Sequence, residues 1–275
     1  MAQGRAPRSP AVRIAIVAAA FLIVIAIVAV VVALNAPANW LARHLADRTD
    51  GVVLLADAQG TVWSGSAVVA LAPRATSSES DRQGAGLALP GRITWTLEFE
   101  RALAPVLHLT HDGVLLQPVL ARLTSDGLAL DAGAAVLPAA MLRLAGAPLN
   151  TLLPQGRCEL RWNAFRIDRR GVFGGDGILR IASFALALSP VRPLGDYRIA
   201  WTSGERGIDW QLATERGPLV LEGGGSLAGR RGQARVVVRV AGDAPVAVAR
   251  QLDPLLDMIG RRGPGEAVID TAGRP

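Results

Sequence analysis

One uninterrupted apolar stretch limits what this chain can fold into more than any other feature. Residues Ile14 to Leu34 include no charged or polar side chain, no Gly and no Pro. As a helix, these 21 residues would be about 30 Å long, which matches the hydrocarbon core of a bilayer. Val, Ile and Leu dominate the stretch, and each favours insertion by roughly 0.3–0.6 kcal/mol. We therefore predict a transmembrane helix over residues 14–34.

The charges before this stretch predict its orientation. Arg5, Arg8 and Arg13 precede it with no acidic residue among them. The positive-inside rule then makes residues 1–13 a short cytoplasmic tail and places everything after residue 34 on the other side of the membrane. A cleaved signal peptide is the alternative, with Ala36-Pro37-Ala38 as the cleavage site. The apolar core is too long for that reading and Pro is unfavourable at the middle position, so we expect a single-pass anchor.

After the apolar stretch, the period of the sequence changes from helical to extended. Residues 37–46 have apolar positions three and four apart, which predicts a short helix. Gly91–Glu100 is the clearest strand, because Ile93, Trp95, Leu97 and Phe99 alternate with polar residues. The links between later strand candidates are too short for crossover helices, so we expect antiparallel pairing. The predicted fold is mainly β: a curved antiparallel sheet domain with a few short helices after the transmembrane helix.

The remaining segments complete this expectation. We divide the part beyond the membrane into β-rich halves, 35–147 and 148–275, with a C-terminal amphipathic helix at 246–259 whose inward residues are Val246, Leu252, Leu255, Leu256 and Ile259. A hairpin around His111-Asp112-Gly113 is predicted to join strands 106–110 and 114–117, and residues 138–144 to form a helix. Within 157–168, a one-residue shift of the apolar register predicts a β-bulge. The Ser-rich segment 73–86 is predicted to be a mobile loop. Further strands are expected at 52–56, 61–71, 128–130, 178–188, 196–203, 207–213, 219–227 and 233–240. Alternation assigns these residues of the C-terminal strands to the inward face: Ala182, Phe184, Leu186, Leu188, Tyr197, Ile199, Trp201, Ile208, Trp210, Leu212, Ala234, Val236, Val238 and Val240.

Charge and cysteine content exclude two classes of protein. The net charge is +6, and all 29 basic residues are Arg, which indicates coding bias more than a nucleic-acid-binding surface. The Arg residues alternate with acids along the strands instead of gathering with aromatics on one face, so no nucleic-acid partner is predicted. Cys158 is the single cysteine, which rules out an internal disulfide. We expect its thiol to be buried in a strand.

A search for chemistry finds no site. His108 and His111 are the only histidines close in sequence, and positions i and i+3 of a strand point to opposite faces, so they cannot share a metal. Gly223-Gly224-Gly225 lacks the helix and Lys of a phosphate loop and reads as a bulge or a kink. Ser64 and Ser66 belong to a glycine-flanked strand entry. We predict no catalytic, cofactor-binding or metal residues, no small-molecule substrate and no enzyme; a membrane-tethered enzyme is the reading with least support.

Several segments, taken in order, resemble the type II secretion system protein N family. The resemblance runs along nearly the whole chain after the apolar stretch. Its first two pieces precede the division at residue 148, and the other three follow it. The pieces are Pro37-Ala38-Asn39-Trp40-Leu41, Gly60-Thr61-Val62-Trp63-Ser64-Gly65, Pro193-Leu194-Gly195-Asp196-Tyr197, Gly217-Pro218-Leu219-Val220-Leu221-Glu222-Gly223 and a closing helix with Gly260.

This resemblance implies a non-catalytic component of the type II secretion system in the cell inner membrane. Its N-terminus would be cytoplasmic and its large C-terminal domain periplasmic. The partners implied are the inner membrane, the assembly-platform proteins of the secretion machine and the outer-membrane secretin. The alternative from a different class is a membrane-anchored lipid-handling protein, in which a curved sheet holds acyl chains in an apolar groove. A continuous apolar groove would favour this alternative.

Overall fold

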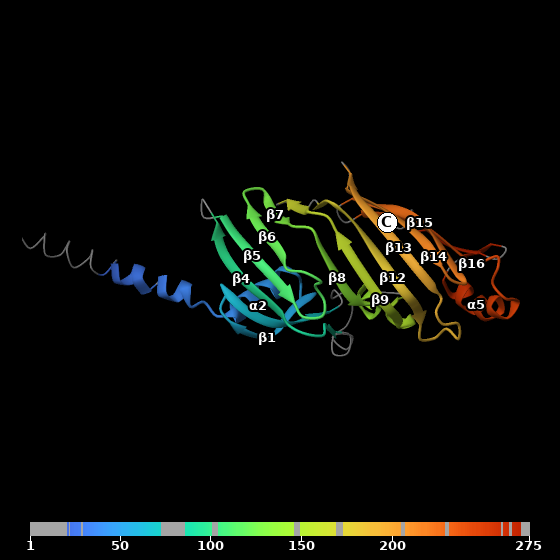
Figure 1. Cartoon of the computed structure of the whole chain (residues 1–275), viewed down its shortest axis with the longest axis horizontal. Coiled ribbons are helices and arrows are strands. Elements are labelled where there is room, and N and C mark those ends of the chain that lie inside the picture. Colours follow the sequence, from blue (N-terminus) through green and yellow to red (C-terminus); the bar gives the residue numbers. More distant parts are fainter. Residues whose placement is uncertain are drawn as a thin grey trace, which may run out of the picture.

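The computed structural model of the chain describes residues 21, 23–28, 30–72, 86–100, 104–145, 149–168, 173–204, 207–228, 231–259, 261–263 and 266–270. The fold is mainly β, as predicted, and consists of two antiparallel nine-stranded sheets with few helices. The two sheets follow one another along the long axis of the molecule (Figure 1).

The first sheet contains most strands of the N-terminal part of the chain. Its order is β1 (Val53–Gly60), β2 (Ser64–Leu71), β4 (Ile93–Glu100), β5 (Ala104–His111), β6 (Val119–Thr124), β7 (Gly127–Leu130), β10 (Phe165–Asp168) and β11 (Phe173–Gly174). The short strand β3 (Leu87–Ala88) also pairs with β2. The predicted alternation of β4 is present, because Trp95 is buried and Thr94 and Glu98 are exposed.

The second sheet contains the long C-terminal strands. Its order is β17 (Arg261–Gly263), β18 (Glu266–Asp270), β16 (Arg231–Val240), β15 (Leu219–Ala228), β14 (Gly207–Arg216), β13 (Gly195–Gly204), β12 (Asp176–Leu186), β9 (Pro154–Trp162) and β8 (Gly133–Pro138). Consecutive strands are neighbours through most of this sheet, as short hairpin links require.

The chain changes sheet three times, between β7 and β8, between β9 and β10, and between β11 and β12. β8 follows β7 in sequence but pairs with β9, whereas β10 follows β9 and pairs with β7. The sheets are also joined by backbone hydrogen bonds beside β8: Val136 N donates to Val114 O at 2.8 Å and Leu116 N donates to Ala134 O at 2.9 Å. Segments 133–138 and 165–174 are therefore exchanged between the two sheets.

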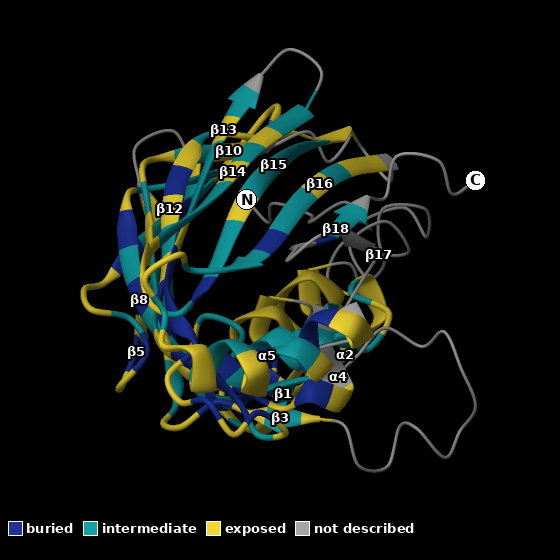
Figure 2. Cartoon of the chain, turned by 90° about the vertical axis from the view of Figure 1, so that its right-hand side faces the viewer, coloured by how far each residue is buried: buried dark blue, intermediate teal, exposed yellow. Residues whose placement is uncertain are grey.

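The helices lie on one side of the strands. Viewed along the long axis, the strands curve around a hollow side, on which α2 (Ala38–Arg48), α4 (Leu149–Leu152) and α5 (Val246–Ile259) lie (Figure 2). We call this side of the two sheets the concave face. α2 covers the first sheet there, with Ala38 against Ala67 and Trp95. α5 covers the second sheet through Leu252 and Leu256, which pack with Tyr197.

The main core lies between α5 and the strand ends nearest to it. Leu194, Tyr197, Val238, Leu252 and Leu256 are at most 1% exposed. The Tyr197 hydroxyl donates to the Leu219 carbonyl at 2.9 Å, so the buried polar group is satisfied. The helix 246–259 was predicted with these bounds, but Val246 was wrongly assigned to its inner face. Val246 is exposed because it lies six residues, about 240°, before Leu252 around the helix.

The predicted anchor lies only partly within the described residues. Residues 21, 23–28 and 30–34 are helical, with apolar side chains about half exposed, and project from the sheets (Figure 1). Among the described residues, no helix is both long enough and apolar enough to cross a bilayer. Residues 1–20 and the predicted loop at 73–85 lie outside the described residues.

Two expectations about strands are wrong for the same reason. Segment 114–117 is not a strand paired with β5, because β6 takes that place and Leu115 forms only an isolated bridge with Ala135. Segment 157–168 is not one bulged strand: β9 ends at Trp162 and β10 starts at Phe165 in the other sheet. The shift of apolar register therefore marks a change of sheet. Sequence periodicity reports the face of a residue but not its partner strand.

The remaining corrections are local. The predicted helix at 138–144 is the 3-10 helix η2 (Ala139–Ala145), and residues 149–152 form the short helix α4, where no helix was predicted. Beyond α5, residues 261–263 and 266–270 form the β17–β18 pair. Strand β12 ends at Leu186, which leaves Leu188 exposed instead of inward.

Candidate functional site

The histidines do not form a site. His108 lies on the convex face of β5, where Nε2 is 3.7 Å from a carboxylate oxygen of Glu98. His111 is buried on the opposite face, and its Nδ1 is 3.0 Å from the Asp112 carbonyl. Among the residues that the structure describes, no group of three His, Cys, Asp or Glu side chains could hold a metal ion.

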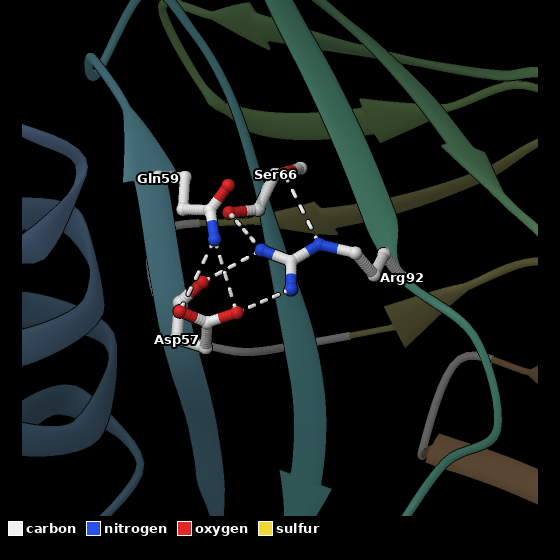
Figure 3. Close-up of polar contacts among 4 residues, drawn as sticks. All are labelled: Asp57, Gln59, Ser66 and Arg92. Atoms are coloured by element: carbon white, nitrogen blue, oxygen red, sulfur yellow. Dashed lines mark hydrogen bonds and ion pairs between the residues drawn. The ribbon is translucent and has the colours of Figure 1, made fainter.

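A polar cluster at the anchor end of the first sheet serves the backbone (Figure 3). Asp57 has a positive φ of 48° where β1 shifts register against β2. Its carboxylate accepts hydrogen bonds from Arg92 at 2.6 Å and from Gln59 at 3.1 Å. These bonds hold the pKa of Asp57 below its usual range. Arg92 Nε also donates to the Ser66 hydroxyl at 3.3 Å, so the cluster connects β1, β2 and the start of β4.

The second sheet has a comparable arrangement. Ser183 has a positive φ of 52° at a register shift of β12, and its N–H donates to the Asp196 carboxylate at 2.6 Å. Arg216 pairs with the other oxygen of Asp196. The Ser183 hydrogen bond first, and then Arg216, lower the pKa of Asp196. Both clusters supply hydrogen bonds where a strand is irregular, which is a structural role.

The thiol of Cys158, the single cysteine, is unreactive because it is buried. Cys158 is 3% exposed in β9, as predicted, and is unpaired. Burial raises its pKa to about 11. Since the thiolate is the nucleophile, Cys158 is a packing residue.

The end of the apolar helix is fixed to the first sheet. Trp63, between β1 and β2, donates from Nε1 to the Ala33 carbonyl at 2.7 Å. Val62 N donates to the Ala36 carbonyl at 2.9 Å, and Pro37 forms an isolated antiparallel β-bridge with Thr61. The Trp63 ring also lies 5.8 Å, centroid to centroid, from the ring of Phe99, which is 53% exposed at the end of β4. The helix end and the edge of the concave face are therefore in contact.

Tryptophan rings lie over glycines in both sheets. Four cross-strand pairs place a Gly directly opposite a Trp, and a Cβ on the Gly would lie within 3.0 Å of the ring. The pairs therefore require Gly, because the flat ring occupies the side-chain space of its neighbour. They are Gly65–Trp95, Gly133–Trp162, Gly177–Trp201 and Gly225–Trp210. The run Gly223-Gly224-Gly225 is thus neither a bulge nor a kink, since it stays in register with β16.

The concave face of the first sheet is apolar from strand to strand. Directly paired residues form a row across β4, β5, β6, β7 and β10, and none of its members is ionisable. The next row toward the strand ends is also apolar, with Phe99 and Leu123 more than half exposed. The first row is Leu97–Leu107–Ala121–Leu130–Phe165, and the next includes Leu128 and Ile167.

The second sheet continues this surface. Three adjacent rows lie on its concave face, and they contain no ionisable residue. The convex face of the same strands has Arg161, Arg180, Arg198 and Arg235 among its side chains. The concave rows are Ala135–Leu160–Leu179–Ile199–Leu212–Gly223–Val236–Ile269, Gly133–Trp162–Gly177–Trp201–Trp210–Gly225–Ala234 and Ser203–Ile208–Leu227–Gly232.

A cavity opens where the two sheets meet on this face. It has a volume of about 300 Å³ and is lined by Phe165, Gly175, Trp201 and Ile208. Gly175 joins β11 to β13, because its N–H donates to the Ser203 hydroxyl at 2.7 Å. The lining is apolar and comes from strands far apart in sequence. Sequence reasoning missed this site, since the exchange of β10 between the sheets is what brings Phe165 beside Trp201.

One of the comparisons with known proteins identifies a family. A family model described as type II secretion system (T2SS), protein N matches residues 52–269. The matched interval begins before β1 and ends in β18, so it includes both sheets and the cavity. The comparisons with curated proteins and with solved structures each found no match.

Proposed function

The chain belongs to the type II secretion system protein N family, and we propose that it is a non-catalytic, single-pass inner-membrane subunit of that machine. Its periplasmic domain contacts other secretion subunits, namely assembly-platform proteins and the outer-membrane secretin. The match of a secretion-system family model to both sheets is the observation that carries the proposal.

The anchor is supported by sequence and by side-chain exposure. The apolar side chains at 21, 23–28 and 30–34 are exposed around a helix, which is the pattern of a helix surrounded by lipid. The three Arg residues before residue 14 favour a cytoplasmic N-terminus by the positive-inside rule. The bonds from Trp63 and Val62 to the helix end then hold the first sheet against the outer surface of the membrane.

The convex face of the second sheet fits a protein contact. Arg180 and Arg198 lie directly opposite each other on β12 and β13, and both are exposed. Arg180 pairs with Glu215 at 3.3 Å, so the face carries both signs of charge. Charged, exposed surfaces of this kind determine partner choice through electrostatic complementarity.

Topology is tested by cysteine labelling, because the native thiol is buried. Gly242→Cys places a thiol at an exposed position with open space around it, and Ala2→Cys places one in the tail. A membrane-impermeant maleimide added to spheroplasts should label Gly242→Cys strongly and leave Ala2→Cys unlabelled until lysis. The reverse pattern would refute the proposed orientation.

The secretion role is tested by affinity purification of the tagged full chain from detergent-solubilised membranes. Secretion subunits should be enriched over a matched strain with an unrelated tagged single-pass protein. The charge reversal Arg198→Glu on the convex face should reduce this enrichment. Absence of any secretion subunit, together with normal exoprotein release from a deletion strain, would remove the proposed role.

A further inference from the structure

We propose that the concave face of the two sheets is a binding surface for the acyl chains of membrane lipids, and that the cavity lined by Phe165, Gly175, Trp201 and Ile208 is part of it. The proposal rests on the anchor in the proposed function, because the anchor places one end of the surface at the bilayer. It does not depend on which secretion subunit the domain contacts.

The chemistry of the surface selects an apolar ligand. The rows described above on the concave face of each sheet contain no ionisable side chain, whereas the opposite face of the second sheet has a series of Arg residues. A peptide, a sugar or a phosphate needs hydrogen-bond partners in its site. The cavity lining offers aromatic and aliphatic carbon instead, and such contiguous apolar surface is unusual on a protein unless something binds there.

The surface remains accessible because the helices cover only part of it. α5 buries the row that includes Tyr197 and Val238, but Trp201 and Ile208 lie farther along the same strands and are only partly buried. Leu227, directly opposite Ile208 on β15, is 44% exposed. The glycines opposite the Trp rings add no side chain to the concave face, and a side chain at Gly177 would collide with the Trp201 ring.

Continuity with the anchor identifies membrane lipid as the source of the chain. Phe99 lies at one end of the apolar surface and contacts Trp63, whose indole is bonded to Ala33 at the end of the apolar helix. From there the paired rows lead through Leu130 to Phe165 in the cavity. The five paired strands β4, β5, β6, β7 and β10, separated by ~4.8 Å, make the path from Leu97 to Phe165 about 20 Å long. One bilayer leaflet holds chains of about 15 Å, so the path exceeds the length of one acyl chain.

The face-specific variants use adjacent positions of one strand. Leu227→Glu introduces a charge on the concave face, and Ser226→Glu introduces the same charge on the convex face of the same strand. Leu227 is already largely exposed, so the strand tolerates a Glu there. Ile208→Glu places a charge in the cavity itself and is the stronger of the two concave variants.

The experiment is photocrosslinking of the full chain in nanodiscs of phosphatidylcholine that carries a diazirine in one acyl chain. Adducts are located by peptide mass spectrometry. We expect adducts on the apolar helix, on Phe99 and on the strands of the cavity. Ile208→Glu should reduce the cavity adducts at least tenfold and Leu227→Glu severalfold, whereas Ser226→Glu should leave them unchanged.

The outcomes separate this proposal from the secretion role. Adducts on the apolar helix alone would overturn the acyl-chain site while leaving the anchor intact. If Ile208→Glu abolishes co-purification of a secretion subunit and the cavity gives no adducts, the concave face is a protein interface and the lipid proposal is refuted. Cavity adducts in a chain that purifies without any secretion subunit would support the lipid site and refute the secretion role.

Discussion

Because Gly133 lies opposite the Trp162 ring, Gly133→Ala should destabilise the wild-type chain but stabilise a chain in which Trp162 has been replaced by a smaller residue. The three atoms nearest to a Cβ built on Gly133 all belong to the Trp162 ring, within 3.0 Å. In the wild-type chain, Gly133→Ala must therefore displace the indole, and overpacking of this kind costs about 1–3 kcal/mol of unfolding free energy. For a domain of this size, that corresponds to a fall in Tm of about 2–12 °C.

Removal of the ring removes the clash. In a Trp162→Val background, the Ala methyl enters space that the indole has left. Because the φ of Gly133 is not in the left-handed region, Ala then stabilises the chain by about 0.4–1 kcal/mol through the unfolded state. The double-mutant cycle should give a coupling free energy of about 2 kcal/mol between the two positions.

Thermal unfolding of the detergent-solubilised full chain, followed by circular dichroism, measures all four members of the cycle. Gly174→Ala is the matched control, because Gly174 also lies in a strand but has no atom within 4 Å of its Cβ position. Its unfolding free energy should change by no more than about 0.5 kcal/mol. An equal loss of stability from Gly133→Ala in both backgrounds would refute the assignment of the clash to the ring.

Three further predictions follow from burial and charge. The pKa of Asp196 in the folded chain lies below its unfolded value of 3.8. The ionised carboxylate therefore stabilises the fold above pH 3.8, and this stabilisation is lost as pH falls through the folded pKa. Asp196→Asn should lower Tm at neutral pH and reduce the dependence of Tm on pH in the acidic range. Leu256→Ala should cost about 2–5 kcal/mol in the same unfolding assay, since Leu256 is fully buried under α5, and the exposed Met258→Ala should cost about 0.5 kcal/mol or less. Cys158 should react with maleimide at neutral pH only after denaturant is added, because burial raises its pKa to about 11; rapid labelling of the native chain would contradict its placement.

Periodicity within a segment predicted where the helices and strands of this fold lie better than it predicted which strands pair. The bounds of α5 and the inward residues of β13 and β16 follow from spacings within one segment. The hairpin assigned to 114–117 failed because its competitor, β6, could be recognised only by its pairing with β5. Pairing depends on contacts between distant residues, which a single sequence does not report.

The candidate site shows the same difference between the face of a residue, which alternation predicts, and its partner strand, which alternation does not predict. Alternation identified Trp201 and Ile208 as inward residues, and that assignment is confirmed. The cavity also needs Phe165, which belongs to the other sheet, and its place follows from the short break at residues 163–164. The glycines and tryptophans of these pairs can be read from the sequence, but which Gly lies opposite which Trp cannot, because that depends on the register of the paired strands.

The two exchanged segments make the sheets inseparable by a single cut. A fragment that ends at residue 147 would carry β8 without β9, and the complementary fragment would carry β10 without β7. Each piece would present unpaired backbone N–H and C=O groups and tend to aggregate alone. The same edges are complementary to one another, so the two pieces synthesised in one cell would restore both ladders by reassociation. The chain is thus suited to a split-protein reporter, in which signal appears only where both pieces meet.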